Sequence, residues 1–126
     1  MKIALTATGT DLSSQLDPRF GRAERFLVVD TDNGEVQVVE NTHNQNLPRG
    51  AGIQAAGAVA QSGARVLITG NCGPKAFQVL QQAGIEVVTG AQGKISDLIK
   101  QYDQGQLRPA KAPNVQGHWN QGGRRA

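Results

Sequence analysis

The sequence predicts a single α/β domain built on a mixed five-stranded sheet, and three observations carry that prediction. The chain has 126 residues, which is the size of one domain. Its first third holds short apolar segments that lack helical periodicity, two of them joined by a strong turn signal. After residue 50, short apolar runs alternate with segments of helical periodicity, the pattern of strands connected by helices.

The first third of the chain predicts three strands. Lys2–Thr8 places Ile3, Leu5 and Ala7 on one side, as a half-buried strand does. Two further strands are rich in β-branched residues, and Asp32-Asn33-Gly34 between them favours a hairpin, because Asn-Gly supplies the positive φ of a tight turn. Their expected bounds are Arg25–Thr31 and Glu35–Asn41, and the segments Gly9–Arg22 and Thr42–Gly50 are expected to be loops.

The rest of the chain predicts three helices and two strands in alternation. Each helix shows apolar residues at helical spacing and has a glycine just beyond its end. In the first helix, Ile53, Ala56 and Ala60 are expected to form one apolar face. The helices are expected to begin at Ala51, Pro74 and Lys94 and to end near Gln61, Ala83 and Asp103, with strands at Arg65–Thr69 and Ile85–Thr89.

The order of these elements restricts the topology of the sheet. Right-handed crossovers connect parallel strands, and a hairpin connects antiparallel ones. Numbered along the chain, the strands are therefore expected in the order 3-2-1-4-5, with strand 2 antiparallel to the others and helices covering the sheet.

The C-terminal residues differ in composition from the rest. Residues 105–126 contain prolines, glycines and glutamines without periodicity, so a basic, disordered tail is expected after a domain of residues 1–104. The tail carries four basic residues and no acid, whereas residues 1–104 carry nine basic and ten acidic residues. A near-neutral domain argues against a nucleic-acid-binding face.

Composition also excludes several classes of protein. A single cysteine, Cys72, excludes an internal disulfide framework and a cysteine-rich metal site, and His43 and His118 are too far apart for a compact zinc site. No apolar run approaches the roughly 20 residues that span a bilayer, and the N-terminus turns polar at Thr6, too early for a signal peptide. A cytoplasmic protein is expected, without a membrane or nucleic acid as partner.

The most promising binding region is the carboxyl edge of the sheet, where ligands of open α/β folds bind. The segments leaving this edge are rich in glycine, and three of them lead into helices, whose exposed N–H groups favour anions. Ordinary turns also need glycine, but the convergence of all four segments favours an anion site. They are Gly9–Arg22, Thr42–Gly52, Gly70–Lys75 and Gly90–Lys94, and they carry the cations Arg19, Arg22, Arg49, Lys75 and Lys94.

Cys72 and His43 are open to two interpretations each. A lone cysteine is most often a small buried hydrophobe. The segment Gly-Asn-Cys-Gly-Pro, however, puts Cys72 at a helix start near Lys75, which favours an ionised and accessible sulfur. His43 is either a plain loop residue or a ligand.

Enzymatic readings find little support. Gly50-Ala51-Gly52-Ile53-Gln54-Ala55 matches the letters of a dinucleotide fingerprint, but a long loop separates it from the preceding strand and no acid follows about 20 residues later. Lys2–Thr8 has no carboxylate that could hold a nuclease metal, and nothing orients a Cys72–His43 pair. The protein is therefore expected not to be an enzyme.

Four motifs in order resemble the dinitrogenase iron–molybdenum cofactor biosynthesis family, including its small stand-alone, orange-protein-like members. The likeness covers about residues 1–104 and implies a ribonuclease H-like three-layer fold without nuclease residues. One departure is Arg49, since many relatives have a His there. The motifs are Asp17-Pro18-Arg19-Phe20-Gly21-Arg22-Ala23, Phe26 to Asp30, Gly50 to Ala56, and Thr69-Gly70-Asn71-Cys72-Gly73-Pro74-Lys75-Ala76-Phe77.

The resemblance implies non-enzymatic binding, storage or transfer of a metal–sulfide cluster containing molybdenum with iron or copper. Such a cluster is an anion that brings its own sulfides, so its carrier needs N–H donors, cations and at most one thiolate, for which Cys72 is the candidate. The candidate binding residues are Arg19, Phe20, Gly21, Arg22, His43, Arg49, Gly50, Gly52, Asn71, Cys72, Gly73, Lys75 and Gly93.

The expected partners are a cluster donor or acceptor protein and a maturation ATPase, and the expected state is a monomer or weak dimer. Two alternatives use the same residues. One is a binding module for a small molecule or a nucleotide phosphate, and the other is an interaction protein for the ATPase.

Overall fold

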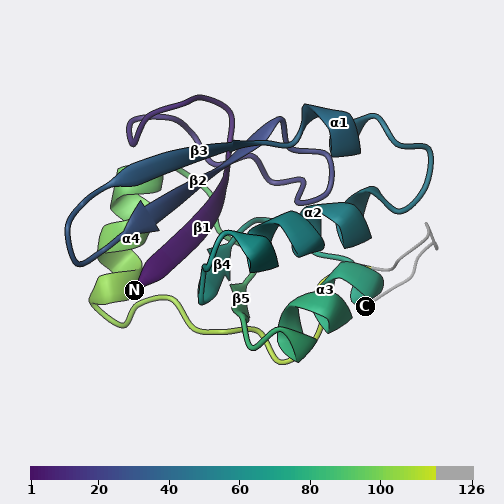
Figure 1. Cartoon of the computed structure of the whole chain (residues 1–126). Coiled ribbons are helices and arrows are strands. Elements are labelled where there is room, and N and C mark those ends of the chain that lie inside the picture. Colours follow the sequence, from purple (N-terminus) through teal and green to yellow (C-terminus); the bar gives the residue numbers. More distant parts are fainter. Residues whose placement is uncertain (116–126) are drawn as a thin grey trace.

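The computed structural model describes residues 1–115, which form five strands and four helices (Figure 1). The strands are β1 (Lys2–Ala7), β2 (Arg25–Asp30), β3 (Val36–Glu40), β4 (Val66–Ile68) and β5 (Glu86–Val88). The helices are α1 (Thr42–Gln45), α2 (Ala51–Gln61), α3 (Pro74–Gln82) and α4 (Ile95–Asp103).

The five strands form one mixed sheet in the order β3-β2-β1-β4-β5. β1 lies at its centre, antiparallel to β2 and parallel to β4, so Leu5 is paired with Leu27 on one side and with Ile68 on the other. β5 continues the sheet parallel to β4, and β3 continues it antiparallel to β2. The predicted topology is confirmed.

Helices cover both faces of the sheet and complete three layers, with α2 and α3 on one face and α4 on the other (Figure 1). The alternation of side chains along β1 explains the two cores. Ala4 packs beneath α2 and α3 in a cluster that includes Phe26 and Leu67. Ile3 and Leu5 face the opposite way, into the cluster beneath α4. The three-layer fold is confirmed, and each core is built mainly from aliphatic residues.

The buried face of α2 differs from the predicted one. Ile53 is 38% exposed, and the residues that α2 buries are mostly small: Ala51, Ala55, Ala56 and Val59. Small residues let α2 lie close to α3, where a Cβ at Gly52 would be 3.4 Å from the Cβ of Ala76. Close helix packing, rather than the burial of the largest side chain, fixes the rotation of α2.

One expected loop contains a helix, and the first part of the expected tail contacts the domain. Thr42–Gln45 forms the short helix α1 inside the segment predicted to be a loop. Residues 105–115, the first part of the predicted tail, have no helix or strand but lie against the domain. The N–H of Ala110 donates to the carbonyl of Val87 in β5 at 2.6 Å, and Leu107 packs against the core beneath α4. The rest of the predicted tail, 116–126, lies outside the described residues.

Within residues 1–115, no helix has the length and apolar character needed to cross a membrane.

Candidate functional site

The carboxyl ends of β1, β3, β4 and β5 lie at one edge of the sheet, and the loops that follow them are hydrogen-bonded together. The N–H of Asn71, after β4, donates to the carbonyl of Pro18, in the loop after β1, at 2.7 Å. The carbonyl of Asn71 accepts from the N–H of Phe20 at 3.3 Å. On the side of β5, the carbonyl of Gly93 accepts from the N–H of Leu16 at 2.8 Å. The predicted convergence of these loops therefore exists.

Two glycines allow the loop after β1 to lie directly against its neighbours. A Cβ added at Gly21 would be 2.8 Å from the backbone nitrogen of Gly52, at the start of α2. A Cβ added at Gly70 would be 2.7 Å from the Cα of Pro18. Both contacts are with backbone, which cannot rotate away as a side chain can. Gly21 and Gly70 are therefore required by close approach.

The first turns of α2 and α3 lie side by side at this edge. Each helix starts after a glycine, Gly50 or Gly73, which has no side chain to cap the first amides. Gly50 has φ of +76°, a conformation that favours glycine. A Cβ added at Gly52 would lie 3.4 Å from the Cβ of Ala76, so the two first turns are neighbours. Two helix dipoles therefore direct their positive ends to one region, which favours an anion there.

Arg19 and Arg22 differ from the free cations that the sequence suggested. Arg19 forms a two-point ion pair with Asp17, Nε to Oδ1 and Nη2 to Oδ2, both at 3.1 Å. The Asp17 side chain is 5% exposed, and its hydrogen bonds raise the pKa of Arg19 above the ordinary value. Arg22 donates from Nη1 to the carbonyls of Gln45 and Leu47, both at 2.7 Å. Both guanidiniums thus hold loops in place, although the side chain of Arg19 is still 61% exposed.

Lys94 is exposed and forms no ion pair within residues 1–115, but it lies at the start of α4, which follows β5. Arg49 and Lys75 are the predicted cations that remain available at the starts of α2 and α3. Both are exposed, and neither forms an ion pair with any of residues 1–115. Arg49 immediately precedes Gly50 at the start of α2, and Lys75 lies in the first turn of α3. They add positive charge to the two helix starts.

Of the two interpretations of Cys72, the structure supports the buried side chain and not the accessible, ionised sulfur. The residue is 1% exposed and belongs to the core beneath α2 and α3, with Phe20 and Ala76. Burial raises the pKa of the Cys72 thiol to about 12. Its Sγ lies 3.8 Å from the carbonyl oxygen of Gly73. The helix start does not lower the pKa here, because the side chain turns inward and loses its hydration.

We therefore expect the Cys72 thiol to react slowly with a thiol reagent such as 5,5′-dithiobis(2-nitrobenzoic acid). At pH 8 the rate in the native protein should be at least about 100-fold below that in guanidinium chloride, because little thiolate forms and the sulfur is covered. The chain has one cysteine, so all the absorbance reports on this site. Equal rates in the native and denatured protein would contradict the buried position.

Three other residues that the sequence predicted to bind the ligand do not have the positions expected of ligand contacts. Phe20 is 3% exposed, and its ring centroid lies 5.5 Å from that of Phe26, so it anchors the loop to the core. Gly93 contacts the loop after β1 on the side of β5, away from the starts of α2 and α3. His43 is exposed in α1, and within residues 1–115 its side chain has no hydrogen bond to the converging loops.

The predicted residues therefore separate into two groups. The structure does not bring His43 and Gly93 to the paired helix starts. It brings together the remaining residues, in contact or along the same short segments: Arg19, Phe20, Gly21, Arg22, Arg49, Gly50, Gly52, Asn71, Cys72, Gly73 and Lys75.

Several residues that shape this edge escaped sequence reasoning. Asp17 accepts from the backbone N–H of Arg19 at 2.9 Å, and the run Asp-Pro-Arg carries the signal of such a turn. The Nδ2 of buried Asn41 donates to the carbonyl of Ala23 at 2.8 Å. Thr6 donates to the carbonyl of Asp17 at 2.6 Å, which ties the loop to β1. Asn114 contacts the turn after β4 from the far end of the chain, and no local signal marks it.

Among residues 1–115, no group of three or more His, Cys, Asp or Glu side chains could hold a metal ion. The edge offers instead backbone N–H groups and cations. Such an edge can hold an anion whose metals already carry other ligands.

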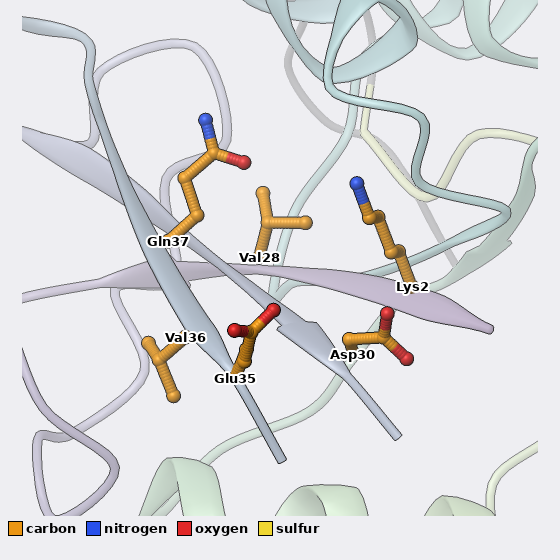
Figure 2. Close-up of a pocket in the computed structure, with 6 residues that line it drawn as sticks. All are labelled: Lys2, Val28, Asp30, Glu35, Val36 and Gln37. Carbon is orange, nitrogen blue, oxygen red and sulfur yellow. The ribbon is translucent and has the colours of Figure 1, made fainter. Parts of the chain in front are cut away.

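A hollow of about 390 Å³ lies elsewhere, beside the hairpin of β2 and β3 (Figure 2). Its polar lining contains Asp30 and Glu35 as well as Lys2, so carboxylates outnumber the ammonium group. Lys2 and Asp30 lie at the edge of the sheet opposite the converging loops. This hollow is ill suited to an anion and does not belong to the candidate site.

Several known proteins are similar to this chain in sequence and in fold. The apo form of the orange protein from Desulfovibrio gigas has a similar structure, with a TM-score of 0.88 and 46% identity over 90% of this chain and 95% of that one. A Thermotoga protein of the DUF35 family has a TM-score of 0.74 and 35% identity over 86% and 91% of the two chains. An uncharacterised protein of Methanocaldococcus jannaschii is 36% identical over 110 residues, 85% of this chain and 89% of that protein.

The family model described as dinitrogenase iron-molybdenum cofactor matches residues 1–105, which include every strand, every helix and the converging loops. The expected departure at Arg49 lies inside this match. The chain therefore belongs to the dinitrogenase iron-molybdenum cofactor family.

Proposed function

We propose that this protein binds an anionic metal–sulfide cluster at the paired starts of α2 and α3 and carries it, without catalysing a reaction. One observation supports the proposal above all others. Two uncapped helix starts, Gly50 and Gly73, lie side by side with exposed Arg49 and Lys75. This arrangement concentrates N–H donors and positive charge in one region.

The donor set fits such a cargo. A cluster whose metals are surrounded by sulfide needs no protein ligands, and residues 1–115 provide no cluster of ligating side chains. Cys72, the one thiol, is buried and its pKa is raised to about 12, so a thiolate is not ready to coordinate metal. Hydrogen bonds and charge would then hold the cargo. Such contacts are individually weak, which allows the cluster to pass to an acceptor.

The description of the family supports molybdenum as one metal of the cargo and iron as the second. Copper as the alternative second metal follows from the resemblance to orange-protein-like members noted in the sequence. A carrier also needs a source and a destination. We propose that a donor or acceptor protein, or a maturation ATPase, supplies or receives the cluster.

The test is the binding of tetrathiomolybdate, alone and with iron(II) or copper(I), measured without oxygen by visible absorption and by metal analysis. Arg49→Ala and Lys75→Ala should each weaken binding by about 1–2 kcal/mol, which is a roughly 5- to 30-fold rise in Kd. Each side chain is exposed at a helix start, so the fold should not depend on it.

Arg65→Ala is the matched control. Arg65 is also exposed, and its substitution removes the same charge. It precedes β4, however, and so lies at the opposite edge of the sheet. Its Kd should equal that of the wild-type protein. An equal rise in Kd in all three variants would show that only the net charge of the protein affects binding. Inorganic phosphate that competes at the same concentration as tetrathiomolybdate would favour a phosphate-binding module instead.

A further inference from the structure

The segment that follows α4 returns to the candidate site and contacts it. Ala110 pairs with Val87 at the outer edge of β5, at 2.6 Å between nitrogen and oxygen. Four residues later, the side chain of Asn114 lies on the turn between β4 and α3. Its Oδ1 accepts from the N–H of Cys72 at 2.9 Å, and its Nδ2 donates to the carbonyl of Gly70 at 2.9 Å and to Oδ1 of Asn71 at 3.3 Å.

The N–H of Cys72 differs from its neighbours in the turn. The N–H and carbonyl of Asn71 are already paired with Pro18 and Phe20, and the carbonyl of Gly70 also accepts from Gly90 at 2.7 Å. Those bonds come from within the domain. The N–H of Cys72 instead takes its partner from the segment after α4. It lies two residues before Pro74, the first residue of α3, and so close to the helix start at which the anion is proposed to bind.

We propose that Asn114 is a latch on this site: its Oδ1 occupies the N–H of Cys72 until the anionic cargo displaces it. The latch rests on the proposed function, because it regulates binding at the same site. An uncharged carboxamide oxygen keeps the donor satisfied in the absence of cargo. An anion forms a stronger, charge-assisted hydrogen bond with the same N–H and can therefore replace it.

The contacts of the segment suit reversible displacement. Residues 111 and 112 before Asn114 and residue 115 after it are exposed, and Asn114 itself is exposed. Apart from its three hydrogen bonds, the nearest anchor is the single backbone bond at Ala110. Displacement of the Asn114 side chain breaks these three hydrogen bonds and can thus free residues 111–115 from the turn without opening the core.

The experiment compares full-length wild-type protein with Asn114→Ala and Asn114→Asp, using tetrathiomolybdate as the probe. Asn114→Ala frees the N–H and should lower Kd by about 3- to 10-fold. Asn114→Asp leaves a carboxylate in the place of the anion and should raise Kd by a similar factor. Gln106→Ala is the control, because it removes an exposed carboxamide from the same segment and should leave Kd unchanged.

Hydrogen exchange at the Cys72 amide gives a second readout that needs no cargo. The exchange should be faster in Asn114→Ala than in the wild-type protein and unchanged in Gln106→Ala. A higher Kd in both Asn114 variants would overturn the latch and make Asn114 a residue that merely positions the turn. An unchanged Kd in Asn114→Ala would overturn it as well.

The two proposals can fail separately. Wild-type protein that binds tetrathiomolybdate, with no gain in Asn114→Ala, keeps the proposed function and rejects the latch. Binding by Asn114→Ala alone supports the latch in its strongest form. Absence of binding in all variants rejects the proposed function and the latch with it, even if hydrogen exchange confirms the contact between Asn114 and Cys72.

Discussion

Gly70→Ala should lower the free energy of unfolding by about 2–3 kcal/mol, the range expected when an atom is forced into a packed site. The new Cβ would lie 2.7 Å from the Cα of Pro18 and 2.9 Å from its carbonyl oxygen. That carbonyl accepts from the N–H of Asn71, so relief of the clash also strains the hydrogen bond that joins the two loops. Urea unfolding followed by circular dichroism measures the loss. A loss of tetrathiomolybdate binding should accompany it, because the same loops form the candidate site.

Gly57→Ala is the matched control for this substitution. Gly57 lies inside α2, and a Cβ there would have no atom within 4 Å outside its own helical turns. Alanine is the better helix former, so the variant should be more stable than wild type by about 0.5–1 kcal/mol. A similar loss of stability in both variants would show that the close approach at Gly70 is not the cause.

The topology could be predicted from the sequence because it depends on short-range signals. Asn33-Gly34 fixes the hairpin of β2 and β3, and Gly34 indeed has φ of +77°. The apolar runs around Leu67 and Val87, each before a helix, indicate parallel strands. The meeting of the loops at one edge follows from that topology, and so the region of the candidate site was predictable as well.

The direction in which individual side chains point was not predictable, because tertiary contacts decide it. Cys72 turns into the core although its neighbours in the sequence favour exposure. Ile53 is exposed because α2 presents its small residues to α3. Arg22 finds two carbonyls more than twenty residues away along the chain. Asn114 was the hardest to foresee, since its contacts with residues 70–72 span more than forty residues.

The buried thiol of Cys72 should make the stability of the protein fall at alkaline pH. Burial raises its pKa in the folded state to about 12 from the ordinary value of 9.0. Below pH 9 the thiol is neutral in both states, so its burial carries no penalty. Between pH 9 and 12 the unfolded state ionises while the folded state does not, and stability declines. From pH 8 to pH 11 the loss should be about 2–3 kcal/mol.

Cys72→Ala isolates this effect from the other groups that titrate at high pH. The variant leaves a small cavity and should be less stable than wild type at pH 8 by about 1–2 kcal/mol, but its stability should fall less steeply towards pH 11. The stability curves of the two proteins should therefore approach and cross as pH rises, in urea unfolding measured at each pH. Parallel curves would contradict a buried, neutral thiol.

Because a neutral thiol is no metal ligand, both Cys72→Ala and Cys72→Ser should also keep most of the binding of tetrathiomolybdate. Complete loss of binding in a folded variant would make Cys72 a ligand after all.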